Sequence, residues 1–432
     1  MKLKKNKNWE QAKKVILGGN SLLSKRPEMY LPGFWPTYFS KASGVHVWDT
    51  EGKKYIDMIF AVGQNTLGYS NKKIDIKVKN FISKGTMSTL NCPEELDLAK
   101  KLIKIHPWSG MVKFARSGGE ANSIAIRIAR AASGNDNVAI CGYHGWHDWY
   151  LSVNLKSINN LNQHLLPGLL PKGVPKSLKN NVHAFKNNDF EKLKQIYSKY
   201  KVGTLIIEIA RNDLPNLDFL KKIKKFCKEK KIILIFDECT SGFRCNLGGI
   251  HLLTKIYPDI AMFGKAIGNG YAITCVVGKK KIMKKAENTF ISSTMWSERV
   301  GFVAALATIN EIERSKSYKK LIKHGKYINR EWKKLSDKHN LNLSIKGIES
   351  ITSFSFPKNN QIYKTFISQE MLKRGYLASN LIYLSTEHTV KIIDKYLNQL
   401  DKIFLQIKNK PLKKIKKLIK GKISHNTFKR LN

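Results

Sequence analysis

Mostly apolar runs recur through the middle of the chain and alternate with segments of helical spacing. Residues 202–209, 231–236 and 259–263 are rich in Ile, Leu, Val and Phe, which is typical of strands buried on both faces of a sheet. Residues 216–230 and 302–309 instead place their apolar side chains along one face of a helix. Strands that alternate with helices predict an α/β fold with a mainly parallel central sheet.

The two ends of the chain follow patterns of their own. Residues 38–57 alternate in the manner of two strands joined at a turn over 49–52, where Gly52 supplies a positive φ. Further elements are expected as a helix at 9–14, a helical pattern continuing from 310 to about 338, strands at 341–348 and 351–356, and helices at 362–374 and 390–407. We therefore expect a large domain over 61–310 and a small α/β domain built from both termini, 1–60 and 311–432.

Length and composition bound the class of protein. The chain has 432 residues, of which 42% are hydrophobic, so it can bury large cores. It contains no run of about 18 apolar residues, and its basic first residues have no apolar segment behind them, so we expect no transmembrane span, no secretory signal and a cytoplasmic protein. Six cysteines include no CxxC pair, which favours reduced thiols over a disulfide or metal framework.

The formal net charge of +45 raises the question of a polyanionic partner. Lysines are scattered along the whole chain beside many Asn and Ile residues, which indicates a compositional bias and no specific nucleic-acid partner. The densest basic block, 408–430, spaces Leu412, Ile415, Leu418 and Ile419 at helical intervals. We expect a solvated, basic amphipathic tail helix, with contact to RNA or lipid as the alternative.

An acid and a lysine end two neighbouring predicted strands. Asp237 closes the run 231–236, and Lys265 follows the run 259–263 and precedes Ala-Ile-Gly-Asn-Gly. The carboxyl ends of parallel strands form the ligand-binding edge of an α/β sheet. Pyridoxal phosphate chemistry needs this pair, because a lysine holds the cofactor's aldehyde as a Schiff base and a carboxylate keeps the pyridine nitrogen protonated.

The sequences around both residues, FDECTSGFR and FGKAIGNG, resemble the paired motifs of class III pyridoxal-phosphate aminotransferases of the ornithine and glutamate-semialdehyde type. The resemblance implies a fold-type I transferase that binds pyridoxal 5'-phosphate and works as a homodimer with its sites at the subunit interface. In that family the acid binds the pyridine nitrogen and the lysine forms the Schiff base. These roles fall here to Asp237 and Lys265.

The segment FARSGGEANSIAIRIAR predicts a strand end, a Ser-Gly-Gly turn and a helix. Free amides at a helix N-terminus, with glycines that permit close approach, suit a phosphate group. The family reads Ser-Gly-Thr here and holds the cofactor phosphate, which implies the same role for Ser117, Gly118 and Gly119. Gly119 replaces the threonine, so one side-chain contact is expected to be lost. Thr294 aligns with a threonine that binds the phosphate of the neighbouring subunit.

The segment CGYHGWHDWY is rich in aromatic and imidazole side chains. His144 and His147 have no third ligand at a recognisable spacing, so no metal is expected. Trp146 and Trp149 are expected to pack in the core. The segment resembles the family's Tyr-His-Gly motif, which implies that Tyr143 stacks on the pyridine face with His144 beside it.

Two departures from the family pattern concern the surroundings of the cofactor. Glu208 ends the run 202–209 where the family has Glu-Pro, so it is expected either to bind the cofactor or to be structural. Residues 296–299 read Trp-Ser-Glu-Arg where the family often reads Ser-Gly-Asn-Pro, and the long, breaker-rich segment 154–181 is expected to form a wall or lid. The residues expected to contact substrate are Arg26, Arg211, Glu298 and Arg299.

The sequence therefore predicts an aminotransferase that moves an amino group from an amino acid to an aldehyde or ketone. Similar WSER-like variants resemble enzymes of surface-polysaccharide biosynthesis, so a sugar-like acceptor is expected. Within the family the alternative is a glutamate-1-semialdehyde 2,1-aminomutase. The alternative from another class is a basic RNA- or membrane-binding protein on an inactive scaffold.

Overall fold

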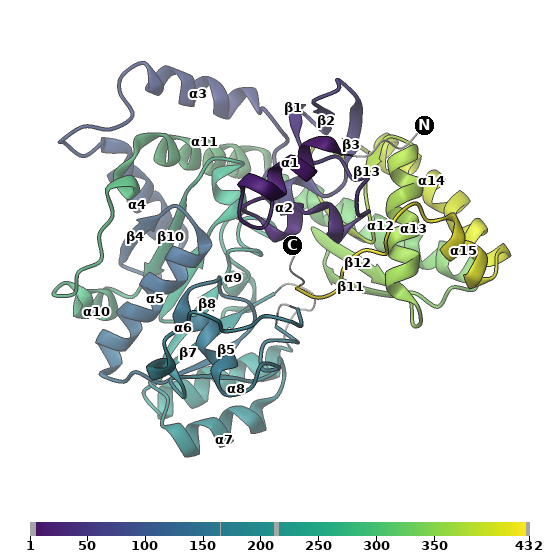
Figure 1. Ribbon diagram of the computed structural model, residues 1–432. Helices are drawn as coiled ribbons and strands as arrows, with labels where there is room; N and C mark the ends of the chain where they lie inside the picture. Colours follow the sequence, from purple (N-terminus) through teal and green to yellow (C-terminus); the bar gives the residue numbers. More distant parts are fainter. Residues whose placement is uncertain (1–5, 165, 211–215, 429–432) are drawn as a thin grey trace. The chain divides into compact units, whose positions relative to one another are not determined.

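The computed structural model describes residues 6–164, 166–210 and 216–428 (Figure 1). These residues form two compact units. The larger unit runs from Lys72 to Tyr318, and the smaller one combines the residues up to Asn71 with those from Lys319 onward. The boundaries between these units lie close to the domain limits predicted at 60/61 and 310/311. The assignment of separate functions to the two domains stays a prediction.

A seven-stranded sheet forms the centre of the larger unit, in the order β4-β10-β9-β8-β7-β5-β6. Neighbouring strands are parallel except around β10, which is antiparallel to both β4 and β9. The predicted α/β class and largely parallel sheet are confirmed. The strands are β4 (Met111–Ala115), β5 (Val138–Cys141), β6 (Val182–Ala184), β7 (Thr204–Glu208), β8 (Ile233–Asp237), β9 (Ile260–Phe263) and β10 (Thr274–Gly278).

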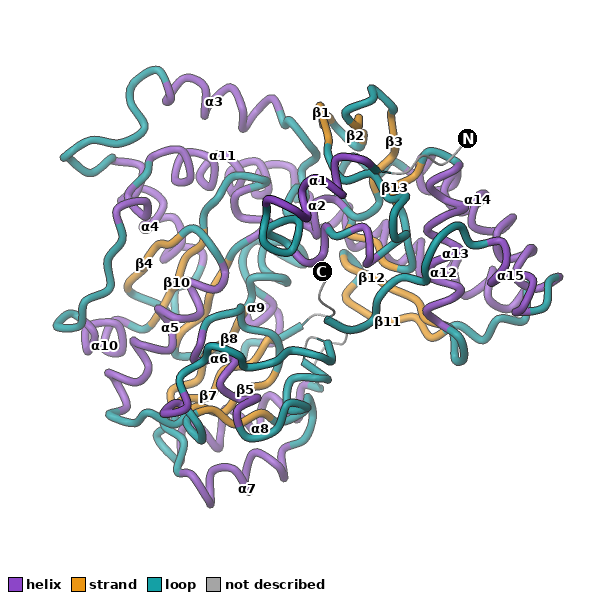
Figure 2. Tube along the Cα trace, in the orientation of Figure 1, coloured by secondary structure: helices purple, strands orange, loops and turns teal. Residues whose placement is uncertain are grey.

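Helices cover this sheet, and Figure 2 shows the strands gathered among them. Helix α5 (Gly118–Ser133) follows β4 and packs against β8, β9 and β10. Its buried face carries Ala, Ile and Asn side chains. A hydrophobic cluster joins this face to the sheet. The other helices are α3 (Lys72–Ile82), α4 (Pro93–Ile105), α6 (Asp148–Leu151), α7 (Phe190–Tyr200), α8 (Leu217–Glu229), α9 (Ile250–Thr254), α10 (Lys280–Met283) and α11 (Arg299–Ser315).

The helical pattern expected from 310 to about 338 is present, but it forms two helices. Helix α11 ends at Ser315, and α12 (Ser317–Lys338) begins two residues later. Lys316 lies between them with φ of 49°, in the left-handed region that ends a helix. Apolar spacing continues on both sides of this residue, so periodicity alone does not reveal the break.

The smaller unit contains two sheets, in the orders β1-β2-β3-β13 and β11-β12-β14. Residues 38–57 form three strands, not the expected two, because Gly44 has a positive φ of 58° and reverses the chain between β1 and β2. The elements of this unit are α1 (Lys7–Val15), β1 (Phe39–Ser43), β2 (His46–Asp49), β3 (Lys54–Asp57), α2 (Phe60–Gly63), α12, β11 (Ser344–Ile348), β12 (Ile351–Ser355), α13 (Asn360–Lys373), β13 (Tyr376–Leu377), β14 (Leu381–Tyr383), α14 (Val390–Asn409) and α15 (Leu412–Leu418).

The basic tail contains a helix that packs against the protein. Helix α15 contacts α13, and Ile415 is fully buried, while Leu418 on the same helix is 42% exposed. The expectation of a solvated tail helix is therefore wrong for its apolar face, because that face covers α13. In the described part of the chain, no helix is both long and apolar enough to cross a membrane.

Candidate active site

Asp237 lies at the carboxyl end of β8 and is buried, with 3% of its surface exposed. Its Oδ1 accepts a hydrogen bond from the Cys239 N–H at 3.0 Å. Its Oδ2 accepts from the Asn122 side-chain amide at 3.1 Å and from His144 Nδ1 at 2.9 Å. A carboxylate offers about four acceptor positions, so these three bonds leave room for one further donor.

The environment of Asp237 keeps this carboxyl group ionised. Burial by itself would raise its pKa. The hydrogen bond and charge interaction with His144, together with the donors from Cys239 and Asn122, outweigh burial and lower the pKa below its ordinary value. The end of β8 therefore presents a fixed negative charge to any cation or protonated ring nitrogen placed beside it.

Lys265 follows the next strand of the sheet. β8 and β9 are parallel, and Asp237 pairs with Met262. Lys265 lies three residues after Met262. Its φ of 45° is unusual for a residue other than glycine. The Lys265 ammonium group donates to Thr240 Oγ1 at 2.8 Å. The side chain is thus held at the same edge of the sheet as Asp237.

Glu208 connects the lysine to the aromatic segment. The Thr240 hydroxyl that accepts from Lys265 donates to Glu208 Oε1 at 3.3 Å. Glu208 Oε2 accepts from the Tyr143 N–H at 3.1 Å. Gly142 has φ of 116°, and a Cβ there would lie 2.4 Å from Glu208 Cβ, so only glycine allows this approach. The ends of β5, β7, β8 and β9 therefore form one connected polar edge.

The two residues of the Tyr-His segment lie differently. His144 is fully buried against Asp237, as the hydrogen bond above requires. Tyr143 is half-buried, and its ring meets Tyr150 edge to face at 5.9 Å. Trp149 is buried as expected, but Trp146 is 73% exposed, so the expectation that it packs in the core is wrong. Its ring stacks on His147 at 4.5 Å instead.

The N-terminus of α5 lies at the same edge of the sheet, because Asn122 in its first turns reaches Asp237. Ser117 caps the helix, and the Ser117 N–H donates a hydrogen bond to the Glu120 carboxylate at 2.8 Å. Within the described residues, the N–H groups of Gly118 and Gly119 donate to no protein acceptor. These two amides form a cradle of free donors at a helix N-terminus, which suits an anionic group.

The segment 294–299 is tied to this cradle. Arg116 Nε donates to the Met295 carbonyl at 2.6 Å, and its Nη2 donates to the carbonyls of Trp296 (3.2 Å) and Glu298. Trp296 Nε1 donates to Glu120 Oε1 at 3.0 Å. Thr294 is exposed at the start of the same segment. The segment is therefore fixed against the turn that precedes α5.

The residues predicted to contact substrate have varied surroundings. Glu298 caps α11 by accepting from the Val300 and Gly301 N–H groups at 2.7 and 3.3 Å. Arg299 forms a two-pronged ion pair with Glu94 at 2.8 and 2.9 Å.

The two remaining arginines lie elsewhere in the chain. Arg26 belongs to the smaller unit, where it lies 5.6 Å from the centre of the Phe428 ring. Burial lowers the pKa of Arg26, and Glu28 partly offsets this. Arg211 lies outside the described residues. The substrate roles of all four residues stay predictions.

Asn122 and Thr240 complete the site although sequence reasoning missed them. Asn122 lies one helical turn after Gly118, whose carbonyl it also contacts at 3.0 Å. Thr240 lies three residues after Asp237. Both positions fall inside motifs that the sequence already indicated, so their spacing was the available signal.

A separate buried network adjoins the site. Glu238 is fully buried and accepts from Ser241 Oγ, the Ile250 N–H, the His251 N–H and His251 Nδ1, at 2.7 to 3.1 Å. Trp108 Nε1 donates to His251 Nε2 at 2.9 Å. This network binds the start of α9 to the end of β8.

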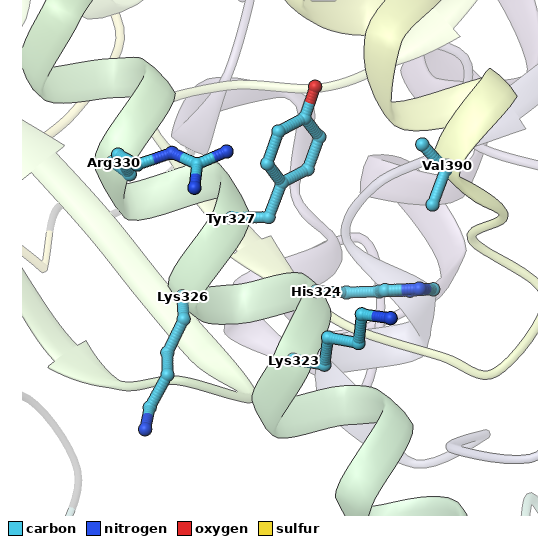
Figure 3. A pocket seen from close by; sticks show the side chains of 6 residues that line it. All are labelled: Lys323, His324, Lys326, Tyr327, Arg330 and Val390. Carbon is cyan, nitrogen blue, oxygen red and sulfur yellow. The ribbon is translucent and has the colours of Figure 1, made fainter.

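A pocket of about 380 Å³ lies in the smaller unit (Figure 3). Its polar side chains come from α12, and Val390 comes from the start of α14. Tyr327 donates to Asp394 at 2.6 Å, and Arg330 pairs with Glu331 at 3.0 Å. None of the predicted site residues lines it. Its lining is Lys323, His324, Lys326, Tyr327, Arg330 and Val390.

Metal chemistry receives no support from the arrangement of side chains. The part of the chain that the structure describes holds no group of three or more His, Cys, Asp or Glu residues placed to bind a metal ion, and its six cysteines are free thiols. His144 is directed to Asp237, as described above.

A large unit with a mainly parallel sheet, a strand-end acid, a strand-end lysine and a glycine-lined helix N-terminus define a pyridoxal-phosphate-dependent enzyme. The family model described as Aminotransferase class-III matches residues 33–404. The chain belongs to this family, and pyridoxal 5'-phosphate is its cofactor. The residues present fit the cofactor, since Asp237 keeps an acceptor position and Gly118 and Gly119 leave a cradle without side chains.

Several known proteins are similar over nearly the whole chain. The chain is 31% identical to the 3-aminobutyryl-CoA aminotransferase of Cloacimonas acidaminovorans (strain Evry), over 91% of this chain and 97% of that protein. It is 30% identical to the glutamate-1-semialdehyde 2,1-aminomutase of Wigglesworthia glossinidia brevipalpis, over 94% and 98%. The solved structure of the FumI protein of Sphingopyxis sp. MTA144, with PLP, has a TM-score of 0.83 at 24% identity, over 93% and 95%.

Proposed function

We propose that this enzyme transfers an amino group from an amino acid donor to an aldehyde or ketone acceptor, through the cluster formed by Asp237 and Lys265. The observation that supports this most strongly is the buried carboxylate of Asp237, which keeps one acceptor position at the end of β8 while Lys265 is held at the end of β9.

When bound, pyridoxal phosphate holds the substrate's amino group and accepts the electron pair of the bond that breaks. In this proposal Asp237 keeps a proton on the ring nitrogen, and His144 and Asn122 fix the orientation of its carboxylate. Tyr143 covers one face of the ring. Lys265 first holds the cofactor and then moves a proton at the reacting carbon, with Thr240 orienting its amino group.

The proposed phosphate contacts are the N–H groups of Gly118 and Gly119 and the side chain of Ser117. Thr294 would reach the phosphate of a second subunit, because it is exposed on a segment that Arg116 holds in place. Met295 beside it is 58% exposed, and Trp146, which stacks on His147 next to Gly119, is 73% exposed. Exposed apolar side chains around the cradle support a homodimer with shared sites.

The proposed acceptor is a polar, sugar-like carbonyl compound. Glu298 caps α11 and Arg299 pairs with Glu94, and both contacts fix the 294–299 segment. In this proposal the two residues shape the wall of the substrate pocket, because their charges are already paired within the protein. A substrate pocket with a rigid polar wall suits a polar acceptor. The second candidate is an aminomutase that returns nitrogen to the same carbon skeleton, which the similarity to the enzyme of Wigglesworthia glossinidia brevipalpis favours.

The first test locates the cofactor. Borohydride reduction of the holoenzyme followed by peptide mapping is expected to find the pyridoxyl group on Lys265. A label on another lysine would refute the assignment. A protein that takes up no cofactor and instead binds RNA or anionic vesicles in a salt-dependent manner would support the inactive-scaffold alternative.

The second test separates the two reactions. The holoenzyme is mixed with glutamate and then other amino acids, and the absorbance change to the pyridoxamine form is compared with the oxo acid released. A one-to-one release supports the aminotransferase. No reaction with any donor, together with conversion of glutamate-1-semialdehyde to 5-aminolevulinate, would replace it with the mutase.

A further inference from the structure

The His147 ring lies against the N-terminus of α5, beside Gly119, which has no side chain. Gly119 has no side chain, and a Cβ built on it would lie 2.7 Å from His147 Cε1 and 2.8 Å from His147 Nδ1. These distances are shorter than real Cβ contacts, so the His147 ring fills the volume that a side chain at position 119 would need.

The chain holds the His147 ring firmly in this position. Trp146 stacks on it at 4.5 Å with an angle of 27° between the rings. Gly145 lies against Gly119, since its own Cβ would be 2.8 Å from Gly119 Cα, and its φ of 99° requires glycine. The His147 carbonyl accepts from the Tyr150 N–H at 2.9 Å. The backbone on both sides of the ring is therefore fixed.

The ring has an unused polar atom at this place. His147 Nδ1 is buried and has no hydrogen-bond partner within the described residues. Burial lowers the pKa of His147, which Glu120 and Asp148 partly offset. A buried ring nitrogen without a partner costs free energy unless a ligand satisfies it. The neighbouring free N–H groups of Gly118 and Gly119 indicate that an anionic ligand would be the partner.

We propose that His147 is a phosphate-binding residue of the cofactor site and supplies the side-chain hydrogen bond that Gly119 cannot make. The inference rests on the proposed placement of the cofactor phosphate at Ser117–Gly119. Gly119 leaves space for the His147 ring, and the ring donates the hydrogen bond to the phosphate in place of a side chain at position 119. His147 binds cofactor in this account and takes no part in moving protons.

The test measures cofactor affinity, with pyridoxal as a matched ligand that lacks the phosphate. His147→Ala is expected to raise the dissociation constant for pyridoxal phosphate on the order of tenfold, because a hydrogen bond to a charged group is lost. The dissociation constant for pyridoxal is expected to stay unchanged. His183→Phe is the control, since His183 stacks on Tyr200 at 3.7 Å on the edge strand β6 and is expected to leave both constants unchanged.

A reciprocal exchange separates this role from a structural one. Gly119→Thr alone is expected to weaken cofactor binding, because its Cβ would press on the His147 ring. The same substitution combined with His147→Ala is expected to recover most of the lost affinity, since the new hydroxyl group enters the space that the ring has left. Recovery in the double variant would show that positions 119 and 147 share one space, while a loss in His147→Ala that spares pyridoxal would assign the ring to the phosphate.

The outcomes decide the proposal. Equal loss of affinity for pyridoxal phosphate and pyridoxal in His147→Ala, or unchanged affinity for both in a variant whose circular dichroism matches the parent protein, would overturn it. If Lys265 is labelled and amino transfer persists while His147→Ala binds cofactor normally, only this inference fails. If the parent protein binds no cofactor, the proposed function fails with it.

Discussion

Asp237 and Glu238 are adjacent, both are buried, and each accepts a hydrogen bond from the Nδ1 atom of a histidine, yet their surroundings differ. Asp237 receives three donors and Glu238 receives four. Successive side chains at a strand end point to opposite faces, so one acid meets the α5 N-terminus and the other meets α9.

The difference in donor number separates a functional carboxylate from a structural one. Every acceptor position of Glu238 is used inside the protein, whereas Asp237 keeps one position for a ligand. The histidines differ in the same way. His251 Nε2 accepts from Trp108, while His144 Nε2 is buried and has no hydrogen-bond partner in the described part of the chain. Burial and charge alone would have marked both acids as equal candidates.

The largest expected effect concerns stability. Glu238→Ala is expected to lower the free energy of unfolding by about 3–5 kcal/mol, because it leaves the His251 side chain and two backbone N–H groups buried without an acceptor. Urea denaturation of the apoenzyme measures this change. The exposed Glu229→Ala on α8 is the control and is expected to change stability by less than about 0.5 kcal/mol. Equal stability of the Glu238 variant and the control would contradict the comparison.

The next effect concerns catalysis. Asp237→Asn is expected to lower turnover on the order of 10²-fold or more, since the amide no longer keeps the ring nitrogen protonated. Cofactor uptake is expected to persist, because the side chain keeps its shape, while the urea midpoint is expected to fall, because the amide nitrogen cannot accept the hydrogen bonds that one carboxylate oxygen accepted. The measurement is the rate of amino transfer together with the absorbance of the bound cofactor. Normal turnover in a folded variant would remove Asp237 from the proposed mechanism.

A smaller effect is expected at Asn122, which touches Asp237 from α5. Asn122→Ala removes one donor to a carboxylate that keeps two others, so turnover is expected to fall about fivefold, equivalent to about 1 kcal/mol. Single-turnover kinetics at saturating cofactor measure it. A loss as large as that of Asp237→Asn would show that Asn122 does more than orient the carboxylate.

The pH dependence of stability sharpens the comparison further. Burial raises the pKa of Glu238, but the hydrogen bonds from His251 and its neighbours outweigh this and hold the pKa below the ordinary 4.5. A lowered pKa means that the stabilisation is complete above about pH 4.5 and is lost as the pH falls through the folded-state value. Urea titrations between pH 3 and 6 are expected to show a flatter curve for Glu238→Ala than for the parent protein.

The strand-end positions of Asp237 and Lys265 could be predicted because each depends on a few consecutive residues. The contacts that complete the site could not, since Asn122 meets Asp237 and Trp296 meets Glu120 across long stretches of chain. Apolar periodicity likewise shows that a strand exists without giving its direction.

Two errors in the fold have the same origin. β10 was not expected, and its antiparallel pairing follows from the short connection after Lys265. The tail helix α15 showed its apolar face in the sequence but not the surface that covers it. Local pattern therefore predicts elements, while the partner of an element depends on the whole chain.

The strand order has a consequence for synthesis of the protein. Among the described strands, β4 pairs only with β10, and in the smaller unit β3 pairs with β13. In both cases a strand that is synthesised early pairs with one that is synthesised much later. At about 5–20 residues per second, β4 stays unpaired on the order of ten seconds after it leaves the ribosome. An unpaired strand edge can join another chain. Lys113, at the centre of β4, places a positive charge on that edge and discourages such pairing until Val276 arrives opposite it.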